Sequence, residues 1–299
     1  MNPNEPGPIA TSELVRALSL AGWADRSERV RLEVNGPDRV RFLHNLTTND
    51  IKRLAVGRGC EAFVTSPQGK TLGYVTVLAL EDRLLLRTDP GGLEHILPHF
   101  QKYGLFDEVA WEDISDRTCE FHLIGPEAPP LLEGLGAELP EPSDLRLRQT
   151  SIVGLEVLLI RESPFGVPGL TLIGDATLRA ELTARFRDAA QMVALDPATC
   201  DALRIEAGTP VFGRDVTADN LPQEVGRDAQ AISFVKGCYL GQETVARIDA
   251  LGHVNKVLKG LLIESGAVPP PGAPLEVEGK VVGRITSSAF SPRLGQPIA

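Results

Sequence analysis

The chain has 299 residues, of which 42% are hydrophobic and 23% charged, and its formal net charge is −10. This length predicts two or three domains, and the acidic balance argues against direct nucleic-acid binding, which requires clustered Lys and Arg. No apolar run approaches the roughly 18 residues of a membrane helix, so no membrane association is expected. Residues 1–11 lack the basic start and apolar stretch of a signal peptide and are predicted to be a disordered tail.

The first part of the chain alternates short helices and strands. A helix capped at Thr11-Ser12 is predicted to end at Gly22, and a second helix begins after Asp38. Glycine and asparagine turns separate apolar runs that alternate with polar residues, which is typical of strands. Strands are expected at 30–34, 60–65, 71–80, 83–88 and 109–114, with a helix at 93–102 between the last two.

From residue 118 the order becomes strand, helix, strand, strand, helix, strand. The strands are expected at 119–124, 145–149 merging towards 153–160, 170–173 and 192–195, and the helices at 127–133 and 175–190. This order is compatible with a small ferredoxin-like α+β module.

Asp196-Pro197 is a strong start for the next helix, because Asp caps the free N–H groups and Pro suits the first turn. That helix should end at Gly208. The irregular stretch at 209–232 is long enough to be functional or disordered. Strands at 257–263, 275–277 and 281–287, with a hairpin turn at Glu278-Gly279, predict a small β-barrel or sheet domain. Residues 291–299 resemble the lead-in to a further strand, so a truncated C-terminus is one expectation.

Four cysteines are scattered along the chain without a CxxC pair: Cys60, Cys119, Cys200 and Cys238. They form neither a disulfide framework nor a zinc or cluster ligand set. An iron–sulfur cluster requires about four thiolates, so no tightly bound metal is predicted. Scattered cysteines without a disulfide pattern are typical of a reducing compartment, so a cytoplasmic protein is predicted.

The stretch KGCYLGQE at residues 236–243 places a thiol between a cation and two glycines. Gly237 and Gly241 permit turns on either side of Cys238, and a helix is expected over Gln242 to Arg247. Lys236 and the positive end of that helix should lower the pKa of Cys238 below the roughly 8.5 of a free thiol. The alternative is that Cys238 is a small buried hydrophobic residue.

A second candidate is the helix end Arg204-Ile-Glu206-Ala-Gly208. Glu206 could point into a cavity and accept two hydrogen bonds from an aminopyrimidine edge. The alternative is a solvated glutamate at a helix end. Glu243 and Arg247 could likewise be no more than an i,i+4 pair.

A P-loop, a dinucleotide-binding turn and a nucleophile elbow are all absent from the sequence. Pro98 interrupts the helix that carries His95 and His99, which argues against a metal site there.

Several motifs resemble the pattern of the YgfZ-type folate-binding proteins, which are relatives of the aminomethyltransferases (GcvT-like). They are LTTND at 46–50, RIEAG at 204–208, PQE at 222–224, AISFVKGCYLGQETVAR at 231–247 and HVNK at 253–256. The resemblance implies an α+β, three-part ring around a central folate site. Its parts would be a discontinuous folate-binding domain (12–116 plus 196–255), a ferredoxin-like module (117–195) and a C-terminal β-barrel (256–299).

The resemblance also implies that the protein binds tetrahydrofolate and assists the assembly or repair of iron–sulfur enzymes, including tRNA-modifying ones, which would be its transient partners. Cys238 would be the reactive thiol, beside the motif residues Lys236, Gly237, Tyr239, Gly241, Gln242, Glu243 and Arg247. Glu206, with Arg204 and Asn49, would hold the cofactor.

One position departs from the aminomethyltransferases, which carry adjacent aspartates on the strand after the glycine turn. This chain has Leu72-Gly73-Tyr74 there, which argues against the aminomethyltransferase mechanism. Folate-dependent one-carbon transfer of an aminomethyl or methyl group is the alternative function.

Overall fold

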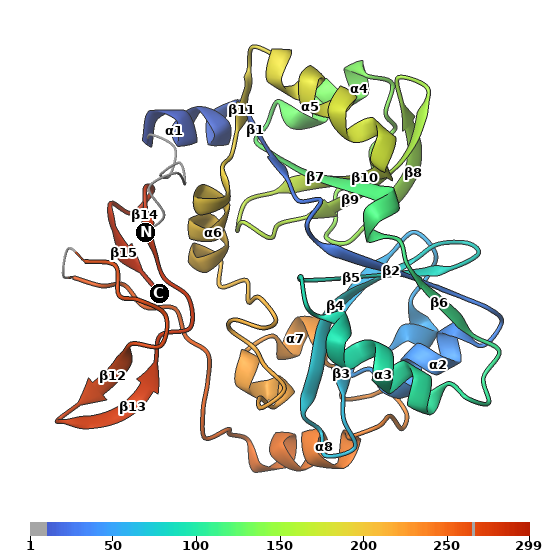
Figure 1. Ribbon diagram of the computed structural model, residues 1–299, viewed down its shortest axis with the longest axis vertical. Coiled ribbons are helices and arrows are strands. Elements are labelled where there is room, and N and C mark those ends of the chain that lie inside the picture. The colour runs from blue at the N-terminus through green and yellow to red at the C-terminus, as the bar shows by residue number, and fades with distance from the viewer. Residues whose placement is uncertain (1–10, 265–266) are drawn as a thin grey trace.

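The computed structural model describes residues 11–264 and 267–299, so residues 1–10 of the predicted tail lie outside the described part. Three parts surround the middle of the molecule: a five-stranded sheet, a six-stranded sheet and a C-terminal segment of short strands (Figure 1). This is the predicted α+β, three-part architecture. No helix in the described ranges is long and apolar enough to cross a membrane.

The five-stranded sheet is antiparallel, with the order β3-β4-β5-β2-β6. Its strands are β2 (Val30–Asn35), β3 (Gly59–Thr65), β4 (Thr71–Ala79), β5 (Leu84–Thr88) and β6 (Ala110–Asp113). Helices α2 (Arg39–Leu46) and α3 (Leu93–Tyr103) cover one face of it through Phe42, Ile96 and Phe100. The predicted meander and both helices are confirmed to within a few residues.

The six-stranded sheet has the order β11-β1-β7-β10-β9-β8. Its strands are β1 (Ala21–Asp25), β7 (Thr118–Ile124), β8 (Leu147–Ile152), β9 (Leu155–Glu162), β10 (Gly169–Asp175) and β11 (Met192–Ala194), and helices α4 (Ala128–Gly134) and α5 (Arg179–Asp188) pack on one face. Without β1 this is the ferredoxin-like strand order. The N-terminal strand β1 is inserted between β11 and β7.

The prediction that Gly22 ends the first helix is wrong. Helix α1 spans Thr11–Ser19, and Gly22 lies inside β1. A Cβ at Gly22 would lie 2.8 Å from the Cβ of Ala17 and 3.1 Å from Cγ1 of Ile124, so close packing requires glycine there. The domain boundaries stay a prediction, although β1 joins a sheet formed otherwise by residues 118–194.

The two sheets pack face to face. Apolar side chains fill much of the contact: Leu78, Leu80, Leu85, Leu147, Leu158, Ile160 and Ile173. Beside them Arg87 of β5 forms ion pairs with Glu120 of β7 and Glu162 of β9, at 2.5 and 2.9 Å. Since all three side chains are buried, the charges must be paired. They tie the two sheets together.

Helix α6 (Pro197–Glu206) begins as predicted, because the Asp196 side chain accepts a hydrogen bond from the backbone N–H of Thr199 at 2.8 Å. The irregular stretch that follows contains a 3-10 turn (Pro222–Val225) and helix α7 (Asp228–Ala231). It packs on the uncovered face of β3 and β4 through Phe212, Val225 and Ile232, which belong to the same buried cluster as Phe63.

Helix α8 (Gln242–Leu251) leads to the C-terminal segment. That segment forms two hairpins, β12 (Pro274–Val277) with β13 (Lys280–Arg284) and β14 (Ala289–Ser291) with β15 (Gln296–Ile298). The predicted turn at Glu278-Gly279 is confirmed, with φ of 51° and 73° at its two residues. Residues 291–299, expected to lead into a strand, contain β15 themselves. The β14–β15 hairpin lies beside α6, on the opposite side of it from the two sheets (Figure 1).

Candidate functional site

Lys236 is a structural anchor of the cysteine loop. Its Nζ donates hydrogen bonds to the carbonyl oxygens of His44 (2.6 Å), Thr47 (2.6 Å) and Asn49 (2.8 Å), all at the end of α2. The carbonyls of His44 and Thr47 are available because a helix leaves its last carbonyls unpaired, whereas the Asn49 carbonyl also accepts from the backbone N–H of Ile51 at 3.1 Å. Nζ also lies 4.6 Å from the centre of the Tyr239 ring. Burial lowers the pKa of Lys236 to about 7.

Cys238 is exposed, whereas Cys119 and Cys200 are buried and Cys60 is half-buried. Burial raises the pKa of Cys60 and of Cys200 to about 12, which keeps those thiols protonated. The alternative that Cys238 is a buried hydrophobic residue is therefore wrong. Neighbouring Phe234 and Val235 are exposed as well.

Cys238 opens onto a surface pocket of about 470 Å³. The other residues that line it come from α2, from the end of α3 and from the loop itself: Phe42, Asn45, Leu46, Tyr103, Asp107, Tyr239 and Leu240. The thiol thus faces the side of the five-stranded sheet that α2 and α3 cover.

The rest of the motif shapes the loop and the next helix. Gly241 has φ +84°, and a Cβ there would lie 2.4 Å from the carbonyl oxygen of Ser66, so only glycine fits this turn. Gln242 begins α8 as predicted. Glu243 and Arg247 lie on its exposed side, and Gly237 is exposed too, whereas Tyr239 is buried. The roles predicted for these residues stay predictions.

Arg204 and Glu206 connect α6 to the C-terminal segment. Glu206 accepts a hydrogen bond from Ser291 and lies 2.7 Å from Nε of Arg293. Arg204 pairs with Asp215 at 2.5 Å and with Asp201 at 2.8 Å. The alternative of a solvated Glu206 is wrong, since its side chain is 1% exposed. Arg204 also donates to the Ser287 hydroxyl at 2.6 Å, so both residues join α6 to a part of the chain that is far away in sequence.

A charged cluster lies on the other face of β3 and β4, the face that α7 covers. Arg227 forms a two-pronged ion pair with Glu61, with Nε 3.0 Å from one carboxylate oxygen and Nη2 bonded to the other. Tyr74 donates its phenolic proton to Glu61 at 2.5 Å. We call Glu61, Tyr74 and Arg227 the Glu61 cluster. Asn49 borders it, donating to the carbonyls of Glu61 and Gln230 at 2.8 Å each.

Tyr74 occupies the place where the sequence departs from the aminomethyltransferases. Gly73 faces the helix-covered core, where its Cβ would lie 2.6 Å from Cδ1 of Ile96, and Tyr74 therefore faces the opposite side with Phe63. Burial and the Glu61 carboxylate raise the pKa of Tyr74 well above its usual value. The cluster thus holds a neutral hydroxyl against a carboxylate whose charge Arg227 balances.

Sequence reasoning missed Glu61 and Arg227. One feature of the sequence could have indicated Glu61, because it is the only charged residue in the strand predicted at 60–65. Arg227 lies in the irregular stretch, where no periodicity indicates which side chain points inward. Its position depends on how that stretch crosses β3.

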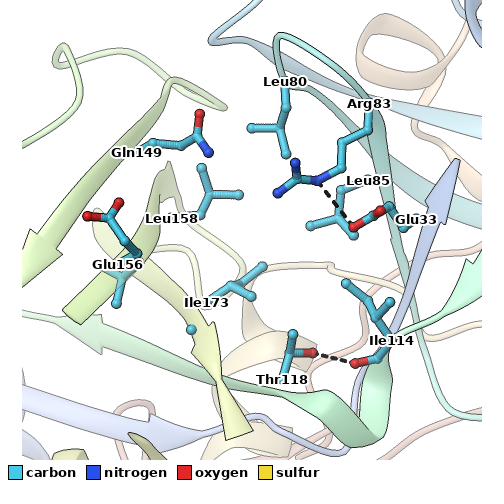
Figure 2. A pocket seen from close by; sticks show the side chains of 12 residues that line it. Glu33, Leu80, Arg83, Leu85, Ile114, Thr118, Gln149, Glu156, Leu158 and Ile173 are labelled. Atoms are coloured by element: carbon cyan, nitrogen blue, oxygen red, sulfur yellow. Dashed lines mark hydrogen bonds and ion pairs between the residues drawn. The ribbon is translucent and has the colours of Figure 1, made fainter. Parts of the chain in front are cut away.

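A third polar region lies between the two sheets, where a pocket of about 180 Å³ has an apolar floor that includes Leu85, Leu158 and Ile173 (Figure 2). Arg83 at its rim lies 3.2 Å from Glu33 and also pairs with Asp82. Because this charge is balanced locally, the pocket is a weaker candidate than the Glu61 cluster. Within the described ranges no group of three or more His, Cys, Asp or Glu side chains could hold a metal ion.

Comparison with known proteins assigns this fold to a family. Residues 7–234 match the GCVT N-terminal domain, and residues 256–299 match the glycine cleavage T-protein C-terminal barrel domain. The chain belongs to this GcvT-like family.

Its relatives include a putative chloroplastic transferase of Arabidopsis thaliana, 30% identical over 88% of the chain and 60% of that protein. The chain thus spans about three fifths of that relative's length. An aminomethyltransferase of Streptomyces avermitilis is 30% identical over 96% of the chain and 79% of its own length. The crystal structure of the aminomethyltransferase T of Bartonella henselae has the same fold, with a TM-score of 0.83 and 20% identity over 97% of this chain and 80% of that one.

Proposed function

We propose that this protein binds tetrahydrofolate and transfers a one-carbon unit at the Glu61 cluster. The observation that carries the proposal is Tyr74, which directs a neutral hydroxyl, supported by Glu61 and Arg227, at the position of the aminomethyltransferase aspartates. Family membership and the aminomethyltransferases among its relatives support the proposal.

Glu206 is the residue that would hold the folate. The aminopyrimidine edge of the folate carries N–H donors suited to a carboxylate, and Glu206 is the predicted acceptor. To bind Glu206, the pterin would have to replace the two groups that now contact its carboxylate. These are the Ser291 hydroxyl and Arg293, whose side chain is 41% exposed. Arg204 and Asn49 are fully engaged with protein groups, so they would position Glu206 and Glu61 rather than contact the ligand.

Tetrahydrofolate would supply the nitrogen that accepts the one-carbon unit. Tyr74 would hold a proton at its hydroxyl oxygen close to the reacting groups, since the raised pKa keeps it protonated at neutral pH. A hydroxyl with so high a pKa gives up its proton poorly, so Tyr74 would act by donating a hydrogen bond rather than as a general acid, and one such donor contributes about 10²- to 10³-fold in rate. This is the loss expected when the hydroxyl is removed.

The test is calorimetry with tetrahydrofolate combined with a transfer assay that uses an aminomethyl donor. The wild-type protein should bind tetrahydrofolate and catalyse the transfer. Tyr74→Phe should still bind tetrahydrofolate, but its transfer rate should fall about 100-fold or more. Glu206→Ala should bind tetrahydrofolate weakly. Glu133→Ala, exposed on α4, is the matched control. A flat wild-type isotherm would end the folate proposal, and binding without transfer from any one-carbon donor would end the transferase part.

A second candidate is an accessory role for iron–sulfur enzymes, with Cys238 as the acting thiol and the client enzymes as transient partners. The placement of Cys238 favours it, because the exposed thiol beside Phe234 and Val235 opens on the opposite side of the sheet from the Glu61 cluster. A thiol there suits a protein partner better than a folate.

In cells that lack the native protein, Cys238→Ser should fail to restore the activity of iron–sulfur enzymes, including tRNA-modifying ones. Half-buried Cys60→Ser is the control and should restore it. Tetrahydrofolate binding should be unchanged in both variants. Full restoration by Cys238→Ser would eliminate this role.

A further inference from the structure

The largely apolar pocket on the outer face of the six-stranded sheet belongs to neither site. Its volume is about 420 Å³, within the range of small-molecule sites. It is lined by Leu18 of α1, by the loop and helix start Gly125, Pro126, Ala128 and Pro129, by Leu123, Arg161 and Leu170 of the sheet, and by Val167, Pro168 and Gly169.

The floor of the pocket follows from strand register. Leu170 of β10 pairs with Leu123 of β7 on one side and with Arg161 of β9 on the other. Side chains paired in this way point to the same face. That face is the one covered by α4 and α5, because Leu123 and Leu170 belong to their core. The pocket therefore lies across the sheet from the contact with β5.

Close backbone packing holds the walls in place. Gly125 has φ +93°, and a Cβ there would lie 2.5 Å from the carbonyl oxygen of Leu20. A Cβ at Gly169 would lie 2.6 Å from the carbonyl oxygen of Leu123. Both glycines therefore pack closely against neighbouring backbone, and neither position has room for a side chain.

Arg161 is the single charged residue in this lining. Its Nε donates to the carbonyl oxygen of Pro140 at 2.8 Å, which fixes the plane of the guanidinium. No carboxylate among the described residues forms an ion pair with it, although the chain carries ten more acidic than basic side chains. A fixed guanidinium with free terminal N–H groups matches a carboxylate in two-pronged geometry.

We propose that this pocket binds a small molecule with an apolar body and one carboxylate, which Arg161 holds at the rim. The apolar lining takes the body, and the guanidinium fixes its orientation. A pterin does not suit the site, because its polar ring edge needs acceptors that the lining side chains do not offer. This ligand is therefore distinct from the proposed folate.

The test is calorimetry of the full chain with decanoate, as a linear probe, and with 2-naphthoate, as an aromatic one. At least one should bind saturably at one per chain. Arg161→Gln should raise the dissociation constant of that probe about tenfold to a hundredfold, because it removes a hydrogen bond to a charged group. The neutral analogue, 1-decanol or 2-naphthalenemethanol, should bind wild type and Arg161→Gln equally. Whichever probe binds more tightly indicates whether the apolar body of the ligand is linear or aromatic.

Two further variants separate a specific site from nonspecific binding. Arg148→Gln, on the neighbouring strand β8 and half exposed, should leave binding unchanged. Val167→Trp should fill the pocket and abolish binding of both acid and alcohol, with an unchanged circular dichroism spectrum as the check on folding. Equal affinity of wild type and Arg161→Gln for the carboxylate would overturn the proposal, as would equal weakening by Arg148→Gln or the absence of saturation with both probes.

Discussion

Lys236 and Cys238 are two residues apart, yet the fold gives them separate environments. The lysine points back into the protein and satisfies three carbonyls at the end of α2. The thiol points outward onto the pocket formed with Asn45 and Tyr103. At the residue scale, therefore, the lysine holds the loop that presents the cysteine.

Lys236→Met is expected to lower the free energy of unfolding by about 2 to 3 kcal/mol, because it leaves buried carbonyls without donors. It should also speed the reaction of Cys238 with a disulfide reagent, since the loop loses its anchor. Urea unfolding and thiol-labelling rates measure the two effects. Exposed Lys102→Met is the control. A variant as stable as wild type would show that Lys236 does not anchor the loop.

At the scale of elements, strand β1 decides how the chain is assembled. It carries the N-terminal segment into the second sheet, between β11 and β7. The glycine in β1 lets helix α1 pack directly on the strand. Helix α6 plays a comparable role at the other end of the module, where Arg204 and Glu206 bind the C-terminal segment.

Gly22→Ala should destabilise the protein by about 1 to 3 kcal/mol, the usual cost of overpacking. The added methyl would meet the Cβ of Ala17 at 2.8 Å. Gly134→Ala, in α4 with no atom within 4 Å of the new Cβ, is the matched control and should be neutral or slightly stabilising. Denaturant midpoints of both variants test the expectation, which a neutral Gly22→Ala would contradict.

At the scale of the whole molecule, polar groups buried around the sheet contact couple stability to pH. His122 of β7 is buried, with Nδ1 2.8 Å from the hydroxyl of Thr171 and its ring against Phe165. Burial lowers its pKa from 6.5 to about 4, despite the nearby Glu162. Between these values the unfolded chain binds a proton that the folded chain excludes. Stability should therefore fall as the pH falls from 6.5 to 4.

The expected slope from His122 is about 1.4 kcal/mol per pH unit at most. His122→Gln should remove that contribution, since glutamine does not titrate. Unfolding free energies of both proteins between pH 4 and 7 measure the difference. His44, whose pKa burial also lowers to about 4, should keep its own contribution in the variant. Parallel pH profiles would show that His122 does not titrate as described.

The sequence by itself determined much of the local structure and the family. Alternating apolar residues, the Asp196-Pro197 start and the Glu278-Gly279 turn specify elements through contacts between near neighbours, and the cysteine motif indicated the GcvT-like fold. Only the tertiary structure decided which distant residues meet: β1 with β7, Glu206 with Ser291, and Glu61 with Arg227, which is 166 residues away. Such contacts depend on strand order and on the path of an irregular segment, and neither leaves a periodic pattern in the sequence. The same strand order and chain path place the Cys238 thiol and the Glu61 cluster on opposite faces of the five-stranded sheet.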